Sequence, residues 1–299
     1  MIYISRERNS KEDIITKSSG FLNFLYNTFI GRLFLKLLIT RPISVLVGLF
    51  MNSRLSKCLI KRFIDKNDIN VFEYDDRKYH SYNDFFTRKV ISYKRPINAS
   101  KDVLISPCDS KLLAYKITKD LTLNIKNSYY SINSLVDDDI LDDYVGGDAL
   151  VFRLSTDNYH RYCYIDSGSK GKNYKIKGVL HTVQPISLER YNFYNTNSRE
   201  WTILNTNNFG KVIQVEIGAL CIGKIKNAHE THIFKRGEEK GYFEFGGSTI
   251  VLLFKKNTIK LDDDIYNNSK ENIETIVKYG ERIGKARFFT RVINKIMKK

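Results

Sequence analysis

The sequence is poor in cysteine and proline, with four of each among 299 residues. The cysteines form no CxxC pair and lie too far apart for the dense disulfide framework of small secreted domains. We therefore expect reduced thiols at Cys58, Cys108, Cys163 and Cys221. The first residues, MIYISRERNSKEDIITKSSG, are polar and mixed in charge, which is not typical of a cleavable signal sequence. We expect the protein to stay inside the cell.

Long uncharged apolar runs are also missing. The longest run in the apolar N-terminal part lies between Arg41 and Arg54, which is shorter than the roughly 20 residues that a spanning helix needs. No glycine-rich phosphate-binding fingerprint follows a predicted strand. The many basic residues do not gather into a recognisable nucleic-acid module. The sequence therefore predicts no membrane-spanning helix and no nucleic-acid partner.

What the sequence has is a formal net charge of +16 and 42% hydrophobic residues. The charge favours an anionic partner, such as a lipid surface or an acidic substrate. From Phe21 to Phe63 the chain is rich in Leu, Phe and Ile at helical spacing, with Lys and Arg between them. Two interpretations stay open for this segment: a helical layer packed on the rest of the protein, or amphipathic helices in a membrane interface.

Beyond about residue 70 the pattern changes to short β-branched and aromatic runs bounded by Gly, Asn, Asp and Ser. A helical pattern returns only at 272–285. We therefore predict an α+β protein in two parts. An N-terminal amphipathic helical segment, 1–70, would associate with a membrane, and a mainly antiparallel β catalytic domain would span 71–299.

The stretch AHETH superficially resembles a zinc-protease motif. Its histidines, His229 and His232, are three residues apart and lie between predicted strands. The HExxH motif needs a spacing of four on one helix face. We therefore expect no metal site.

Three stretches carry residues of chemical interest, although each has an ordinary explanation when taken alone. The glycines of FEFGGSTIVLLF, at 243–254, are typical of a bend beside a strand. Asp109 in SPCDS follows Pro107, as in an Asx turn. His160 in NYHRYC follows a predicted strand, where a half-buried hydrogen-bonded histidine is common. None of the three decides a function by itself.

Taken in order, these stretches resemble the phosphatidylserine decarboxylase family over roughly residues 75–257. The resemblance rests on YNDFFTRKV and KRPI, SPCDS, YHRYCYIDSG, GVLHTVQPISL, VEIGALCIGKI and KGYFEFGGST. It implies a pyruvoyl-dependent carboxy-lyase of phospholipid biosynthesis, made as a zymogen that cuts itself between Gly247 and Ser248. The products would be a β chain, 1–247, and an α chain, 248–299, which stay associated.

The resemblance also gives Ser248 its role. After cleavage it becomes a covalent pyruvoyl group, the one cofactor implied, which forms a Schiff base with phosphatidylserine and releases carbon dioxide to leave phosphatidylethanolamine. Chemistry explains the residue types at the cut. A glycine at 247 uncovers its own carbonyl and permits unusual dihedrals, and the Ser248 hydroxyl can attack that carbonyl once a base takes its proton.

The resemblance assigns Asp109 and His160 to self-cleavage, and His160 also to proton transfer on the substrate. The chain departs from the family pattern in having Ser110 for a glycine, Asn158 for an aspartate and Cys163 for a second histidine. That second histidine is often assigned to cleavage. Either His160 alone serves, or Cys163 or His181 contributes, or processing is impaired; Asn158 and Thr249 are supporting candidates.

We expect a peripheral protein on the cytoplasmic side of the cell membrane, with phosphatidylserine in an anionic surface as its partner. The oligomeric state, a homodimer included, stays open. Two alternatives remain: a pyruvoyl decarboxylase of another amine, and an unprocessed protein that binds anionic lipid without catalysis.

Overall fold

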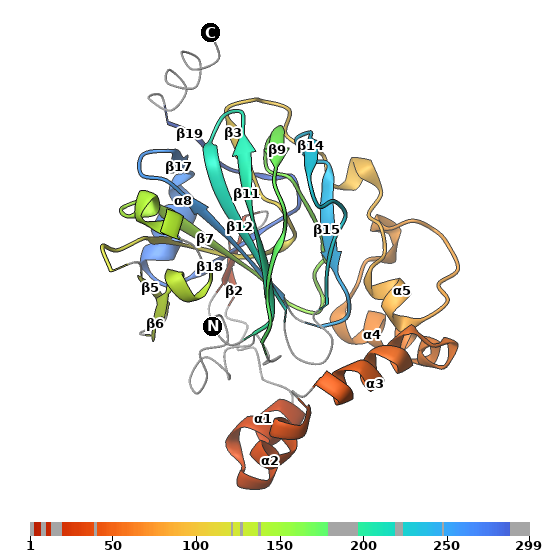
Figure 1. Ribbon diagram of the computed structural model, residues 1–299. Coiled ribbons are helices and arrows are strands. Elements are labelled where there is room, and N and C mark those ends of the chain that lie inside the picture. The colour runs from red at the N-terminus through yellow and green to blue at the C-terminus, as the bar shows by residue number, and fades with distance from the viewer. Residues whose placement is uncertain are drawn as a thin grey trace.

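The computed structural model describes residues 3–6, 10–12, 20–38, 41–120, 122–125, 128–136, 139–178, 197–218, 224–246 and 248–287. An 11-stranded sheet forms its centre, with neighbours in the order β14-β9-β11-β12-β16-β7-β4-β18-β1-β2 and β10 paired with β11 (Figure 1). These strands are β1 Tyr3–Ser5, β2 Ser10–Glu12, β4 Ser110–Lys116, β7 Asp148–Leu154, β9 Gly168–Lys170, β10 Tyr174–Ile176, β11 Arg199–Thr206, β12 Gly210–Gly218, β14 His232–Phe234, β16 Ser248–Phe254 and β18 Glu274–Val277.

Among the described strands of this sheet, β1 and β18 pair in parallel and the other pairs are antiparallel. This confirms the predicted α+β class with a mainly antiparallel β domain. Strand β1 lies within the range predicted as helical, and the described helices begin only at Gly20.

The central strands are apolar on both sides, and all seven residues of β7 and of β16 are buried. Alternation along β16 sends Ile250, Leu252 and Phe254 into one core cluster and Val251 and Leu253 into the other. Each such side chain stabilises the fold by about 1.5–3 kcal/mol through burial. Strand β16 is therefore held firmly in the middle of two cores.

Three smaller sheets complete the β part. Their strands are β13 Ile225–Asn227, β15 Glu239–Phe243 and β8 Arg161–Cys163 in the first; β17 Ile259–Leu261, β19 Arg282–Ala286 and β3 Val103–Ile105 in the second; and β5 Thr122–Ile125 with β6 Ser128–Ser131 in the third. Tyr162, Cys163 and Phe243 of the first small sheet belong to the same core cluster as Ile250. This sheet therefore covers one face of β16.

The helical pattern predicted at 272–285 is wrong. Helix α8, Asp263–Lys270, ends before this range, and the range itself holds strand β18 and most of strand β19. Asn272 has a φ of 55°, in the left-handed region that ends helices. The β-branched residues Thr275, Ile276 and Val277 then enter the sheet beside β4.

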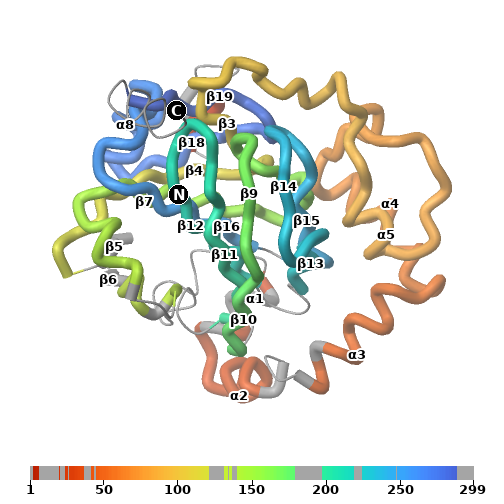
Figure 2. Tube along the Cα trace, turned by 45° about the horizontal axis from the view of Figure 1, so that its top comes forward, coloured from red at the N-terminus to blue at the C-terminus, as the bar shows by residue number. Residues whose placement is uncertain are grey.

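The N-terminal part is helical from Gly20 onwards, with α1 Gly20–Asn27, α2 Phe29–Leu38, α3 Arg41–Asn52, α4 Cys58–Asn67 and α5 Tyr82–Phe86. Short 3₁₀ turns lie at Arg54–Lys57, Val71–Glu73, Ser92–Lys94, Ile132–Ser134 and Asp139–Tyr144. Helices α1 and α2 form a hairpin at one end of the molecule, and α3 leads from it to α4 and α5 on the side of β15 (Figures 1 and 2). In the described part of the chain, every helix falls short of the length or apolarity needed to cross a membrane.

Candidate active site

Three of the predicted site residues lie where strands begin. Asp109 directly precedes β4, His160 directly precedes β8, and Ser248 is the first residue of β16. Strand β7 runs antiparallel between β4 and β16, and its last residue, Leu154, pairs with Ser248. The N–H of Phe243 donates to the His160 carbonyl at 3.0 Å, which ties β8 to the chain just before Ser248. The topology therefore places Asp109 and Ser248 at the same end of the central strands β4, β7 and β16, with His160 on the neighbouring small sheet.

The Ser248 side chain is fully buried, and its Oγ has no hydrogen-bond partner among the described residues. By alternation it lies on the same face of β16 as Ile250, under the small sheet that carries Cys163. The Thr249 hydroxyl, on the opposite face, is also buried and unpartnered within that part of the chain. An unsatisfied buried hydroxyl costs about 1–3 kcal/mol, so the position of Ser248 requires an explanation other than stability.

His160 is fully buried, and a hydrogen bond at Nδ1 orients its ring. Nδ1 lies 2.9 Å from the carbonyl oxygen of Asn158. A carbonyl can only accept, so Nδ1 carries the proton and Nε2 is left with its lone pair. Nε2 has no hydrogen-bond partner of normal geometry in the described structure. His160 is therefore presented as a neutral imidazole with a free basic nitrogen.

The electrostatics agree with this protonation state. Burial lowers the pKa of His160 to about 3, and the charge of Arg88 acts in the same direction, whereas the backbone of Asn158 and Gly246 opposes the shift. The ring of Phe86 lies 4.2 Å from the His160 ring, centroid to centroid. Since Gly246 is two residues before Ser248, the ring lies beside the segment that leads to the serine.

That segment is fixed by α5. The backbone N–H of Phe245 donates to Asn83 Oδ1 at 2.9 Å, and Asn83 Nδ2 donates to Asn52 Oδ1 at 3.0 Å. The Phe245 ring meets Tyr82 at 4.9 Å and Phe86 at 5.4 Å, both edge to face. Gly246 follows with a φ of 137°, which favours glycine. Helix α5 therefore holds the backbone directly upstream of residue 247.

We expect Asn83→Ala to slow the self-cleavage that the family resemblance implies by about 10- to 100-fold, because leaving the partly buried Phe245 N–H without its acceptor costs about 1–3 kcal/mol and releases Phe245 from its position. The rate is measured on freshly synthesised chains by electrophoresis over time. Asn52→Ala is the matched control, since it removes the other hydrogen bond of Asn83 and leaves that to Phe245. Equal slowing in both variants would contradict a role for the Phe245 contact.

Asp109 is buried in an ion pair. Its carboxylate accepts from Arg95 Nη2 at 2.7 Å and Nε at 3.0 Å, and from the backbone N–H of Tyr279 at 2.7 Å. Arg95 also contacts Glu73 at 2.9 Å, and the two carboxylates raise the pKa of Arg95 against the opposing effect of burial. Within the described residues, the hydrogen bonds of Asp109 do not include one to His160. Asp109 therefore lies at the same end of the central strands as Ser248, without a hydrogen bond to His160 in the described structure.

Cys163 is a buried packing residue. Its N–H donates to the Pro107 carbonyl at 2.9 Å, which fixes the loop that carries Asp109. Burial raises the pKa of the Cys163 thiol to about 12, although a hydrogen bond with Tyr279 opposes the shift. The thiol is therefore protonated at neutral pH.

The other candidates have mixed outcomes. Asn158 Oδ1 accepts from the Ser155 N–H at 2.9 Å, so this side chain shapes the turn that presents its carbonyl to His160. His181 and Gly247 lie outside the described residues. Sequence reasoning missed Asn83, Arg95 and Tyr279. Asn83 and Arg95 lie in the stretches YNDFF and KRPI, but no local pattern indicates that they contact residues 245 and 109.

Comparison with known proteins gives consistent matches. The model of a family described as phosphatidylserine decarboxylase matches residues 82–285. A protein named phosphatidylserine decarboxylase proenzyme 2, from Clostridium acetobutylicum, is 53% identical over 268 residues, which are 89% of this chain and 92% of that protein. Proteins named phosphatidylserine decarboxylase proenzyme are 41% identical in Clostridium perfringens, over 88% of this chain and 92% of theirs, and 40% identical in Clostridium tetani, over 93% and 96%.

Proposed function

Because this chain belongs to the phosphatidylserine decarboxylase family, we infer that it is a decarboxylase made as a proenzyme, which converts phosphatidylserine to phosphatidylethanolamine and carbon dioxide. The family's cofactor is a covalent pyruvoyl group, whose carbonyl takes up the substrate amine and accepts the electron pair left by carbon dioxide. The observation that carries the assignment of the site is a pair of buried atoms without partners in the described structure, Ser248 Oγ and His160 Nε2. Such atoms fit a residue that is consumed and a base that acts on it.

We propose that the chain cuts itself between Gly247 and Ser248. His160 Nε2 takes the hydroxyl proton while Ser248 Oγ attacks the carbonyl carbon of residue 247, and the amide becomes an ester as the proton passes to the freed amine. Loss of the Ser248 α-proton and breakage of its Cβ–O bond release residues 1–247 as a carboxylate. Water then adds to the dehydroalanine that remains, and ammonia leaves. The 248–299 chain stays associated because β16 pairs with β12 and β7.

The neighbouring residues have supporting roles in this proposal. Asp109, fixed by Arg95 and the Tyr279 N–H, holds the start of β4 in position at the end of the sheet where β16 begins. Phe86 and Phe245 exclude water from the imidazole. After cleavage His160 stays beside residue 248, where it moves a proton to or from the substrate carbon.

The test is intact-mass measurement of the purified chain together with carbon dioxide release from phosphatidylserine vesicles. We expect two fragments, with the smaller beginning at residue 248 and blocked to Edman degradation. A single full-length species that persists would contradict the proenzyme assignment. A processed protein that leaves phosphatidylserine intact would favour another amine substrate.

We further propose that 1–70 associates with the cytoplasmic face of the cell membrane and that 71–299 forms the decarboxylase domain. Helices α2 and α3 carry a set of large apolar side chains that are exposed: Phe29, Ile30, Leu33, Phe34, Val45, Leu46, Leu49 and Phe50. Exposed cations continue the surface along α3 to α4, namely Arg54, Lys57, Lys61 and Arg62. An apolar face beside cations suits an anionic lipid interface, where each well-placed cation contributes about 1 kcal/mol.

The double substitution Phe29→Asp with Leu33→Asp is expected to weaken binding to phosphatidylserine vesicles at least about 100-fold, because each buried apolar side chain contributes about 1.5–3 kcal/mol. Phe29 is 78% exposed and Leu33 is 65% exposed, so the fold and self-cleavage should be unaffected. Vesicle sedimentation measures the binding. The control is Ile233→Asp on β14, where the isoleucine is 84% exposed. Equal loss in the control would point to net charge instead of this surface.

A further inference from the structure

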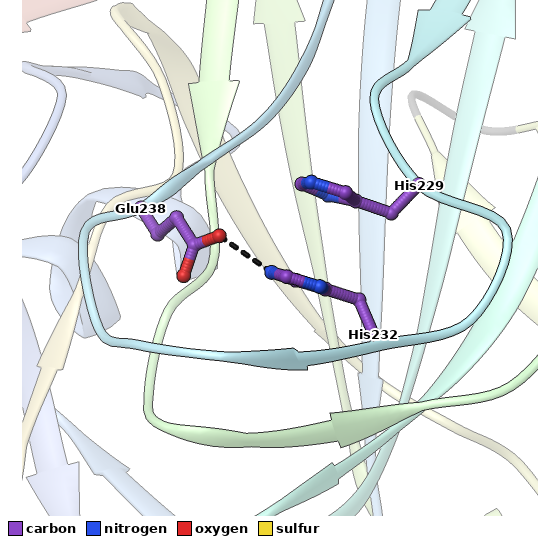
Figure 3. A group of neighbouring side chains, drawn as sticks. All are labelled: His229, His232 and Glu238. Atoms are coloured by element: carbon purple, nitrogen blue, oxygen red, sulfur yellow. Dashed lines mark hydrogen bonds and ion pairs between the residues drawn. The ribbon is translucent and has the colours of Figure 1, made fainter.

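A group of metal-ligating side chains lies away from the candidate active site, around strand β14. His229 lies in the loop before β14, His232 is its first residue, and Glu238 follows the turn after it (Figure 3). One nitrogen of each histidine and one oxygen of the glutamate lie within 4.8 Å of one another. His232 Nε2 lies 2.6 Å from Glu238 Oε1. A loop, the first residue of a strand and the turn after that strand thus bring two imidazoles and one carboxylate close together.

The backbone around these side chains is anchored. Lys170 Nζ donates to the His229 carbonyl at 2.7 Å and to the Glu230 carbonyl at 3.0 Å, which fixes the first loop. Glu238 Oε2 accepts from the Lys235 N–H at 2.8 Å, so the second loop orients its own carboxylate. Only the other oxygen, Oε1, faces His232. The three groups are therefore presented by fixed segments.

The arrangement leaves one polar atom unexplained. The two imidazole rings are stacked face to face, 3.7 Å apart and 7° from parallel. His229 Nδ1 is buried and has no hydrogen-bond partner among the described residues. An imidazole with an unpartnered nitrogen, a second imidazole and an oriented carboxylate together form a ligand set that Zn²⁺ and similar divalent ions prefer.

We propose that His229, His232 and Glu238 bind a divalent transition-metal ion of the Zn²⁺ class. Bonds of about 2.0–2.2 Å bring tetrahedral donor atoms to about 3.3–3.5 Å from one another. Binding therefore breaks the direct contact of His232 Nε2 with Glu238 Oε1, moves these two atoms apart by somewhat under about 1 Å, and turns one imidazole out of the stack. All three side chains are partly exposed, and water fills the fourth position.

The ion would have a structural role. Strand β14 is at the edge of the main sheet and pairs with β9 over three residues. The site ties the loop before this strand to the turn after it, and β15 continues from that turn towards Phe245. The expectation of no metal at AHETH came from the histidine spacing and from the position between predicted strands. Glu238 contributes from beyond the motif, and a β setting does not need the helical spacing of four.

The test uses the processed full-length protein in a Cys58→Ser background, which removes the exposed thiol. After removal of metal with EDTA and dialysis, Zn²⁺ alone is titrated by calorimetry and Co²⁺ by visible absorbance. We expect one equivalent per chain, and a higher apparent Tm at a fixed heating rate when free Zn²⁺ is about 100-fold above its Kd. No binding, or binding without a change in Tm, would overturn the proposal.

Three variants and one control locate the site. His229→Ala, His232→Ala and Glu238→Gln should each weaken Zn²⁺ binding at least about 100-fold, since loss of a group that only orients a ligand already costs about 10–100-fold. His80→Ala removes an exposed histidine elsewhere and should change nothing. Glu238→Gln keeps the side-chain shape, so it tests the site even where a histidine variant fails to fold. Unchanged affinity in Glu238→Gln, or equal loss in His80→Ala, would overturn the assignment.

Discussion

Ser248→Ala is expected to leave one chain of full length that releases no carbon dioxide from phosphatidylserine. Alanine has no hydroxyl to attack the carbonyl of residue 247 and nothing that can become a pyruvoyl group. The loss should be complete, because cleavage and catalysis depend on the same side chain. Intact mass, electrophoresis and carbon dioxide release measure both consequences.

The uncut variant should be no less stable than the uncut wild-type chain. Ser248 Oγ is buried without a partner in the described structure, so its removal relieves a desolvation cost of about 1–3 kcal/mol. Ser269→Ala is the control, because Ser269 Oγ accepts from the Ala114 N–H at 3.0 Å, away from the site. This control should lose about 1 kcal/mol of stability and still be processed. Cleavage of Ser248→Ala at 247–248 would refute the proposed chemistry.

His160→Gln is expected to slow self-cleavage by about 10²–10⁴-fold, whereas Cys163→Ala should leave the rate within about threefold of wild type. The contrast follows from protonation. Burial holds the pKa of His160 at about 3, so Nε2 is available as a base at neutral pH, and burial raises the pKa of the Cys163 thiol to about 12. Pulse-chase electrophoresis gives the rates of both variants.

The pH dependence of the cleavage rate is a second test of whether His160 or Cys163 acts as the base. With a pKa of about 3, His160 is neutral throughout pH 6–8, so the wild-type rate should be nearly flat over that range. A base with the Cys163 pKa would make the rate rise about tenfold per pH unit. Cys163→Ser, which keeps a small polar group, is the conservative control. Arrest of cleavage in Cys163→Ala together with a rising profile would assign the base to the thiol.

Much of the β part could be predicted from the sequence because its signals are local. The apolar run IVLLF indicated a strand, and the family resemblance implied a site built from Asp109, His160 and Ser248; in the structure these residues directly precede or begin strands β4, β8 and β16. The helix predicted at 272–285 was wrong, since Asn272 ends α8 and the following β-branched residues enter the sheet. Periodicity alone could not distinguish these outcomes.

The remaining features depend on contacts between distant parts of the chain. Phe245 is held by Asn83, 162 residues earlier, and the Tyr279 N–H donates to Asp109, 170 residues earlier. Glu238 meets His232 because the chain reverses in the turn after β14. No spacing rule reports such pairs, since each depends on sheet pairing that the local pattern does not encode.

The position of β16 between β12 and β7 has a further consequence for the cut protein. Residues 248–287 supply β16 and β18, and each lies between strands of the upstream chain in the main sheet. Once the 247–248 bond is broken, unfolding releases two separate chains, and refolding becomes a second-order reaction between a sheet that lacks two strands and a short partner chain. The fold forms while the precursor is still one chain. After the cut, we expect the protein to stay folded because it unfolds slowly, and not because the separated chains can refold and restore a folding equilibrium.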